Sequence, residues 1–344
     1  MNRVEWMTPK RRFLSGLFGG KVDRIPVGNP TSVATVELME ETGAFFPEAH
    51  LDAKKMATLA AAGYEILGFD TIMPYFSVQM EAPALGCEMD WGDMETMPDC
   101  TTHPYKEAED IRIPTEEELL KVHSIKTVIE AIRILRDKYP TVAIIGKVMG
   151  PWTLAYHGFG VQSFLMDTIL NPERVRKSLE KLQEISVMFA NLQIRAGADA
   201  ISFPDHATGD LVSPQMYRDF LVHLHQKIVT RIGAPIILHI CGNTLNRAQY
   251  IAEEHFDCFH YDTKTDVIEL KKVLGKNTTT TLIGGINNPE VLLFGTPEDV
   301  KEQAYFAAKA GVEILAPECA IPLRTPNKNL KAIVEAAKTI PVNA

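Results

Sequence analysis

The sequence predicts an α/β fold of the (β/α)8 TIM-barrel type, because strand-like and helix-like segments alternate over most of its 344 residues. Six strand-then-helix units follow one another in the carboxyl two-thirds, and two earlier strand candidates bring the total to eight. A doubly wound sheet is the alternative, but its usual glycine-rich first turn is missing: neither G-x-G-x-x-G nor a Walker A motif occurs. No linker interrupts the pattern, so we expect a single domain over residues 1–344.

The expected strands are short runs of apolar and β-branched residues bounded by Gly, Pro or Asp. They cover residues 24–29, 69–75, 141–148, 199–205, 235–241, 257–262, 279–286 and 312–319. The expected helices have apolar residues at helical spacing. They cover residues 33–42, 116–138, 172–197, 213–233, 245–255, 266–275, 296–311 and 326–339. An extra N-terminal helix is expected at 8–19, and an insertion rich in Pro and Gly turns follows the second strand at 76–115.

Composition and charge exclude several classes of protein. The net charge of −9 and the absence of a basic stripe argue against a nucleic-acid surface. No apolar run approaches the roughly 18 residues of a membrane helix, so no membrane insertion is expected. The odd number of cysteines, five, does not suggest a disulfide framework. Without a recognisable signal peptide, a reducing cytoplasm is the expected location.

Four potential metal ligands occupy the carboxyl ends of expected strands. His239 and Cys241 are two residues apart in the fifth strand and therefore face the same side. Asp262 ends the sixth strand and Cys319 the eighth, so all four are expected at the barrel rim where such enzymes place their chemistry. Taken singly, each cysteine is better explained as a small buried core residue, and His239 as a hydrogen-bonded core histidine. Their convergence favours a catalytic Cys2His zinc site, with Asp262 in the fourth position until substrate displaces it.

A zinc ion with two cysteine ligands favours one kind of chemistry. Two thiolates neutralise the dication and weaken it as an activator of water. They leave it able to bind a third thiol as a thiolate that is still nucleophilic. The ligand set therefore indicates alkyl transfer onto sulfur rather than hydrolysis, without identifying the alkyl donor.

Further polar residues follow other strands at the same rim. The candidate substrate contacts are Asp205, His206, Asn243 and Asn287. Two cations, Lys147 and Arg324, could neutralise an anionic thiol there, although a surface position is the stronger expectation for each.

Two segments of the sequence resemble the uroporphyrinogen decarboxylase superfamily. They are TPKRRFLSGLFGGKVDRIPVG near the N-terminus and EAPALGCEMDWG at 81–92. The segments LHICGN and ILAPECAIPLRTPNKNLKAIVEA resemble one branch of it, the methylcobamide:coenzyme M methyltransferases. The late His-x-Cys…Cys pattern is the specific part of the resemblance.

This resemblance implies a barrel with zinc on His239, Cys241 and Cys319. The implied reaction moves a methyl group from a methyl-Co(III) corrinoid, such as methylcobalamin, to a zinc-bound thiolate, with coenzyme M the expected acceptor. The cobalamin-independent methionine synthases have a similar ligand order, in which Asp262 takes the place of an acid. The segment PDHATG lacks the Asp-x-His-x-x-Gly spacing of cobalamin-binding domains, so the corrinoid is expected to arrive on a separate methylated corrinoid protein or free.

The sequence is also compatible with other functions. The same barrel could catalyse the opposite half-reaction, demethylating a methoxy or methylamine compound onto Co(I), or it could use tetrahydrofolate as acceptor. A non-catalytic corrinoid-binding barrel with structural zinc is a further alternative. Uroporphyrinogen decarboxylation is disfavoured, because the stretch at 28–43 has none of the arginines with which the decarboxylases grip substrate carboxylates.

Overall fold

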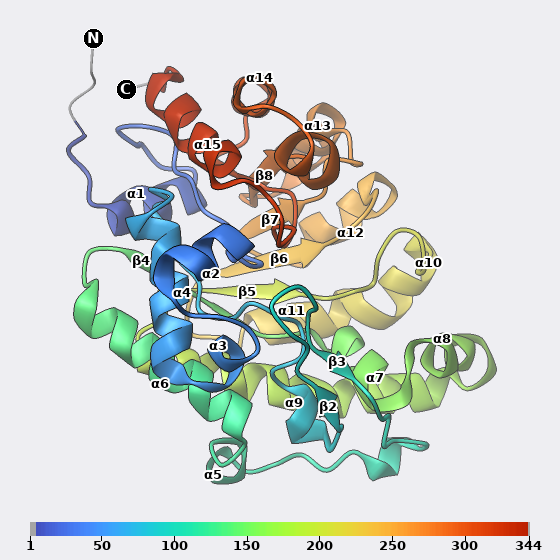
Figure 1. Cartoon of the computed structure of the whole chain (residues 1–344). Coiled ribbons are helices and arrows are strands. Elements are labelled where there is room, and N and C mark those ends of the chain that lie inside the picture. The colour runs from blue at the N-terminus through green and yellow to red at the C-terminus, as the bar shows by residue number, and fades with distance from the viewer. Residues whose placement is uncertain (1–4, 343–344) are drawn as a thin grey trace.

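The computed structural model describes residues 5–342 and shows a curled parallel sheet surrounded by helices (Figure 1). Seven strands pair in the order β1-β4-β5-β6-β7-β8-β9, and every neighbouring pair is parallel. They are β1 (Thr71–Ile72), β4 (Ala143–Lys147), β5 (Ala200–Pro204), β6 (Ile236–Ile240), β7 (Cys258–Tyr261), β8 (Thr281–Ile286) and β9 (Ile314–Pro317). This arrangement confirms the α/β barrel class expected from the alternation.

The segment around Val27 lies at the eighth position of the barrel, between β9 and β1. Val27 forms one parallel bridge with Leu315, and its carbonyl accepts a hydrogen bond from Asp70 N. A full strand over 24–29 was expected, and the difference has a local cause. Pro26 has no N–H to donate, so the ladder with β9 cannot continue. Pro74 limits β1 in the same way.

The helices cover the outside of the sheet. Those of the N-terminal half are α1 (Pro9–Leu17), α2 (Val36–Thr42), α3 (Glu48–Leu51), α4 (Ala53–Glu65), α5 (Glu116–Leu119), α6 (His123–Lys138), α7 (Pro151–Phe159), α8 (Val161–Leu170) and α9 (Pro172–Ala196). Those of the C-terminal half are α10 (Pro214–Tyr217), α11 (His223–Val229), α12 (Ala248–Glu253), α13 (Val267–Asn277), α14 (Pro297–Lys309) and α15 (Asn327–Thr339). In this half α14 packs against both α15 and β8 (Figure 1).

Several expected helices are divided. The 116–138 segment forms α5 and α6, and a π-helical turn, η3 (Arg218–Val222), separates α10 from α11. A second π-helical turn, η5 (Asn288–Leu293), follows β8. The predicted helix starts are confirmed at two positions. The Ser213 hydroxyl accepts a hydrogen bond from Met216 N, and Thr296 forms a capping box with Asp299.

The insertion after β1 adds a small structure above the barrel mouth. It contains two 3₁₀ turns, η1 (Ala82–Leu85) and η2 (Ala108–Asp110), and a hairpin of β2 (Met89–Asp90) with β3 (Asp99–Cys100). A further 3₁₀ turn, η4 (Leu245–Arg247), precedes α12. Between residues 5 and 342, no helix is both long enough and apolar enough to cross a bilayer.

Candidate active site

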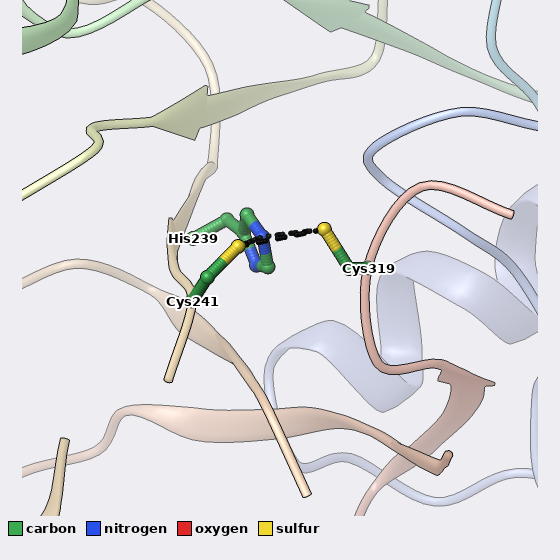
Figure 2. A group of neighbouring side chains, drawn as sticks. All are labelled: His239, Cys241 and Cys319. Carbon is green, nitrogen blue, oxygen red and sulfur yellow. Dashed lines mark hydrogen bonds between the residues drawn. The ribbon is translucent and has the colours of Figure 1, made fainter. Parts of the chain in front are cut away.

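Three of the four expected ligands meet at the carboxyl end of the sheet. His239 is in β6, Cys241 follows that strand directly, and Cys319 follows β9 from 78 residues further along the chain. Figure 2 shows the Cys319 side chain approaching the other two from a separate segment. His239 Nε2 lies 3.1 Å from Cys241 Sγ and 3.3 Å from Cys319 Sγ, and the two sulfurs are 3.5 Å apart.

These separations fit a single metal ion. Tetrahedral zinc, with Zn–S near 2.3 Å and Zn–N near 2.0–2.1 Å, places two sulfur ligands about 3.8 Å apart and a sulfur and a nitrogen about 3.5 Å apart. The observed distances are a few tenths of an ångström shorter. Both cysteines are free, and their sulfurs are too far apart for a disulfide. The donor set is therefore compatible with zinc and open on one side.

A hydrogen bond outside the cluster orients the histidine. The Nδ1–H of His239 donates to the carbonyl oxygen of His260 at 3.1 Å. The proton on Nδ1 leaves the Nε2 lone pair directed at the two sulfurs. Metal-binding histidines usually have such a partner for the second ring nitrogen. The pairing of β6 with β7, which sets His239 opposite His260, supplies this contact.

The two sulfurs influence each other's ionisation. The neighbouring thiol of Cys241 holds the pKa of Cys319 well below its ordinary value, and the same contact together with burial raises the pKa of Cys241. The contact between the two sulfurs therefore favours the thiolate form of Cys319. A bound dication would displace the proton that remains on Cys241.

Asp262 lies close to this group but is not part of it. Among the described residues the cluster of potential metal ligands is His239, Cys241 and Cys319. Asp262 Oδ2 accepts from Gly242 N at 2.8 Å, and Oδ1 accepts from Lys264 N at 2.9 Å. The carboxylate therefore holds the turn after Cys241. Its exchange on and off the metal stays a prediction.

A small cavity of about 180 Å³ opens beside the ligands. Its wall includes His239 and Cys319, two polar side chains of neighbouring strands, and apolar side chains of the insertion. The lining includes Phe76, Val78, Met97, Lys147, His206 and Cys319. Pockets for drug-sized ligands are roughly 300–1,000 Å³, so this one suits a molecule of few heavy atoms.

The predicted substrate contacts occupy different surroundings. His206 lines the cavity, where burial and the neighbouring His239 lower its pKa. Asp205 is fully buried behind it and accepts hydrogen bonds from Thr153 and His225. Asn243 is exposed and caps its own turn by accepting from Leu245 N.

Asn287 also lies away from the cavity wall. It donates to Thr263 Oγ1 at 3.0 Å and accepts from Glu290 N, which ties the end of β8 to the loop after β7. The substrate roles of Asp205, Asn243 and Asn287 stay predictions, and their contacts in this structure hold loops of the rim in place.

The expectation of a surface position was wrong for Lys147 and correct for Arg324. Arg324 is exposed and pairs with Glu95. Lys147 is only 2% exposed, because β4 directs its side chain into the barrel mouth beneath Tyr75. The signal in the sequence was a lysine that closes an otherwise apolar strand, AIIGK, at its carboxyl end. Surface lysines are so common that this signal was outweighed.

Sequence reasoning also missed the buried acid that accompanies this lysine. Glu81 in the insertion is fully buried; it accepts from Met149 N at 2.8 Å and from the hydroxyl of Tyr75. Burial raises the pKa of Glu81 to about 7 against these hydrogen bonds and the nearby Lys147. No pattern in the sequence joins residue 81 to residue 147.

Comparison with known proteins places this site in a family. Residues 8–340 match the family model described as uroporphyrinogen decarboxylase (URO-D). A methylcobamide:CoM methyltransferase of Methanosarcina barkeri is 37% identical over 333 residues, which are 96% of this chain and 97% of that protein. A methylated-thiol–coenzyme M methyltransferase of Methanosarcina mazei is 34% identical over 341 residues, 98% and 91% of the two chains.

Solved structures agree with the sequence comparison. A methyltransferase from Methanosarcina mazei superposes with a TM-score of 0.92 at 36% identity, covering 96% of this chain and 98% of the other. A B12-independent methionine synthase from Shewanella sp. W3-18-1 shares the fold alone, with a TM-score of 0.56 at 13% identity and coverage of 91% and 97%. The chain is thus an enzyme of the methyltransferase type, and it belongs to the uroporphyrinogen decarboxylase family, in the branch that contains the methylcobamide:CoM methyltransferases.

Proposed function

We propose that this protein moves a methyl group from a methyl-Co(III) corrinoid, carried by a partner corrinoid protein, to a small thiol, with coenzyme M as the acceptor. The observation that carries the proposal is the meeting of His239 Nε2 with the sulfurs of Cys241 and Cys319 beside a cavity of about 180 Å³. The printed functions of the relatives, methylcobamide:CoM and methylated-thiol–coenzyme M methyl transfer, support the same reaction class.

In this proposal His239, Cys241 and Cys319 hold Zn²⁺. When bound, zinc would keep the acceptor sulfur deprotonated at neutral pH and near the methyl donor. The chain's own residues supply the surroundings. His260 fixes the histidine through its carbonyl, and Asp262 fixes the turn after Cys241. Phe76, Val78 and Met97 of the insertion form an apolar wall that keeps water from the acceptor.

The same geometry favours methyl transfer to a small thiol over transfer to tetrahydrofolate and over decarboxylation. Two anionic sulfurs in the ligand set favour binding of a nucleophilic thiol over activation of water. The cavity is small for tetrahydrofolate, which carries a pterin and a glutamate tail. The absence of arginines from residues 28–43 continues to argue against decarboxylation.

The test combines turnover with metal content. Purified protein is incubated with methylcobalamin and coenzyme M while the corrinoid spectrum is followed for Co(I) and the thiol for methylation. Metal is measured in the same samples by mass spectrometry. We expect Cys319→Ser to lose at least about 100-fold in activity together with its zinc. Cys100→Ser, in the insertion hairpin, is the matched control and should keep both.

Two outcomes contradict the proposal. One is wild-type turnover by a Cys319→Ser protein that contains no metal. The other is methylation of Co(I) from a methoxy or methylamine donor without any transfer to thiols, which would establish the opposite half-reaction.

A further inference from the structure

Lys147 is a buried cation in the wall of the candidate active-site cavity. It ends β4, its side chain is 2% exposed, and it lines the same cavity as Cys319. Its Nζ donates one hydrogen bond, to the carbonyl oxygen of Thr31, and lies 4.4 Å from the centre of the Tyr75 ring. An ammonium has three donors, so capacity remains for a ligand.

The charge of Lys147 has no direct partner within the chain. Among residues 5–342, no carboxylate oxygen lies within 4.0 Å of Nζ. The nearby acid, Glu81, is engaged by Met149 N and by the Tyr75 hydroxyl. Burial of a cation without a paired anion is costly, and proteins usually keep such a group for a ligand or for catalysis.

The pKa values of Lys147 and Glu81 agree with a site that lacks a bound anion. Burial lowers the pKa of Lys147 to about 7 and raises that of Glu81 to about 7. The nearby Glu81 and Cys319 offset the effect of burial on Lys147 only in part. An anion bound at Nζ would supply the missing charge and favour the protonated lysine.

We propose that Lys147 is a specificity-determining residue: its buried ammonium binds the end of the acceptor molecule opposite to the thiol, and thereby selects acceptors that are anionic at that end. The placement of the acceptor's sulfur near Cys319 and its co-ligands depends on the proposed function. The placement of its anionic group depends only on the position of Lys147. Lys147 and Cys319 line the same cavity of about 180 Å³, so one small molecule can contact both.

The first experiment uses wild-type protein and two acceptors of similar length, 2-mercaptoethanesulfonate and the neutral 2-mercaptoethanol. Methylcobalamin is the donor, and kcat/KM is measured for each thiol. We expect a preference for the anionic thiol on the order of 100-fold or more, because the neutral one leaves the buried cation unpaired. Equal kcat/KM values would overturn the inference.

Variants then test whether Lys147 causes the preference for the anionic thiol. Lys147→Met keeps the length of the side chain without its charge and should bring the ratio of the two kcat/KM values close to one. Lys147→Arg keeps the charge and should retain part of the preference. Arg324→Met is the matched control, because Arg324 is an exposed cation paired with Glu95 at the same end of the barrel; the ratio should stay at the wild-type value.

A binding measurement separates this inference from the proposed function and does not depend on turnover. Ethanesulfonate has the anion but no thiol, and its binding is followed by calorimetry on metal-free protein whose folding is checked by circular dichroism. It should bind to wild type and lose at least about tenfold in affinity with Lys147→Met. Equal affinity in both folded proteins would overturn the inference.

The two proposals can fail separately. If ethanesulfonate binds through Lys147 but no thiol is methylated, the anion site stands and the proposed function fails. If thiols are methylated without regard to their charge, the function stands and the anion site fails.

Discussion

The fully buried His225 forms the centre of a charged group behind the active-site rim. Its Nε2–H donates to Asp205 at 3.1 Å and its Nδ1–H to Glu254 at 2.9 Å, so both ring nitrogens act as donors. Burial by itself would lower the pKa of this histidine. The two carboxylates outweigh burial and raise it to about 9. His225 is therefore charged at neutral pH and pairs two buried acids.

This pairing predicts a pH dependence of stability. A histidine whose pKa is raised on folding stabilises the protein fully below its unfolded pKa near 6.5, and the stabilisation is lost as pH rises through about 9. We expect the free energy of unfolding of wild type, relative to His225→Gln, to fall between pH 6.5 and 9.5. The fall is at most about 3.5 kcal/mol, at about 1.4 kcal/mol per pKa unit.

Urea unfolding at several pH values measures this difference. His223→Gln, an exposed histidine on the same helix, is the control and should follow the wild-type curve. A difference between wild type and His225→Gln that does not change with pH would show that His225 is not charged in the folded protein.

Single residues also show how far the candidate site could be predicted. The spacing of His239 and Cys241 in one strand, and the strand end at Cys319, suffice to bring three ligands together, because strand direction and periodicity are local properties. Lys147 could not be assigned in the same way. Its burial depends on Tyr75 and on an insertion that no periodicity describes.

At the scale of elements, an ion-pair network ties α1 to the opposite, amino end of the sheet. Arg12 in α1 donates to Asp23 at 2.6 Å and to Asp70 at 2.7 Å, and Arg24 also pairs with Asp70. Asp70 directly precedes β1 and accepts from Val27 N. The network thereby holds the short first strand in place, where Pro26 prevents a longer ladder.

Removing Arg12 should destabilise the fold without altering the active site. Arg12→Met leaves Asp23 and Asp70 buried with incomplete pairing, and breaking a buried pair on one side costs about 3–5 kcal/mol. We expect the urea midpoint to fall accordingly while KM for the thiol in folded protein stays unchanged. Arg11→Met, exposed on the same helix, should unfold like wild type; an equal loss of stability in both variants would contradict the role of the network.

Elements differ in how well their sequence predicts them. The helices with capping signals, such as α14 at Thr296, begin where local chemistry places them. The sequence carries no local signal for the π-helical turn that divides the 213–233 helix. On either side of this turn the helix makes tertiary contacts: α11 packs against α9, and the Tyr217 hydroxyl donates to Glu254.

At the scale of the whole molecule, we expect the stability of the barrel core to be largely independent of the proposed metal site. The core consists of strands whose side chains are almost entirely buried, whereas the ligands follow or end the strands at one face. We therefore expect removal of the metal by a chelator to leave the far-ultraviolet circular dichroism unchanged.

The thermal midpoint should nevertheless fall, because a metal that binds only the folded state stabilises it by about 4 kcal/mol at 1,000 times its Kd. Readdition of Zn²⁺ should restore the midpoint in wild type but not in Cys241→Ser. Loss of helical signal on chelation would show instead that the metal is structural.

The amino-acid sequence by itself determined the barrel and the meeting of the three candidate ligands, because alternation, caps and strand periodicity are encoded over a few residues at a time. The tertiary structure alone decided the surroundings of that ligand set. It directed Asp262 to two backbone N–H groups, placed Asp205 in a buried pair with His225, and enclosed Lys147 in the cavity. The physical reason is that burial and charge pairing depend on segments far apart in the chain, which meet only when the barrel closes.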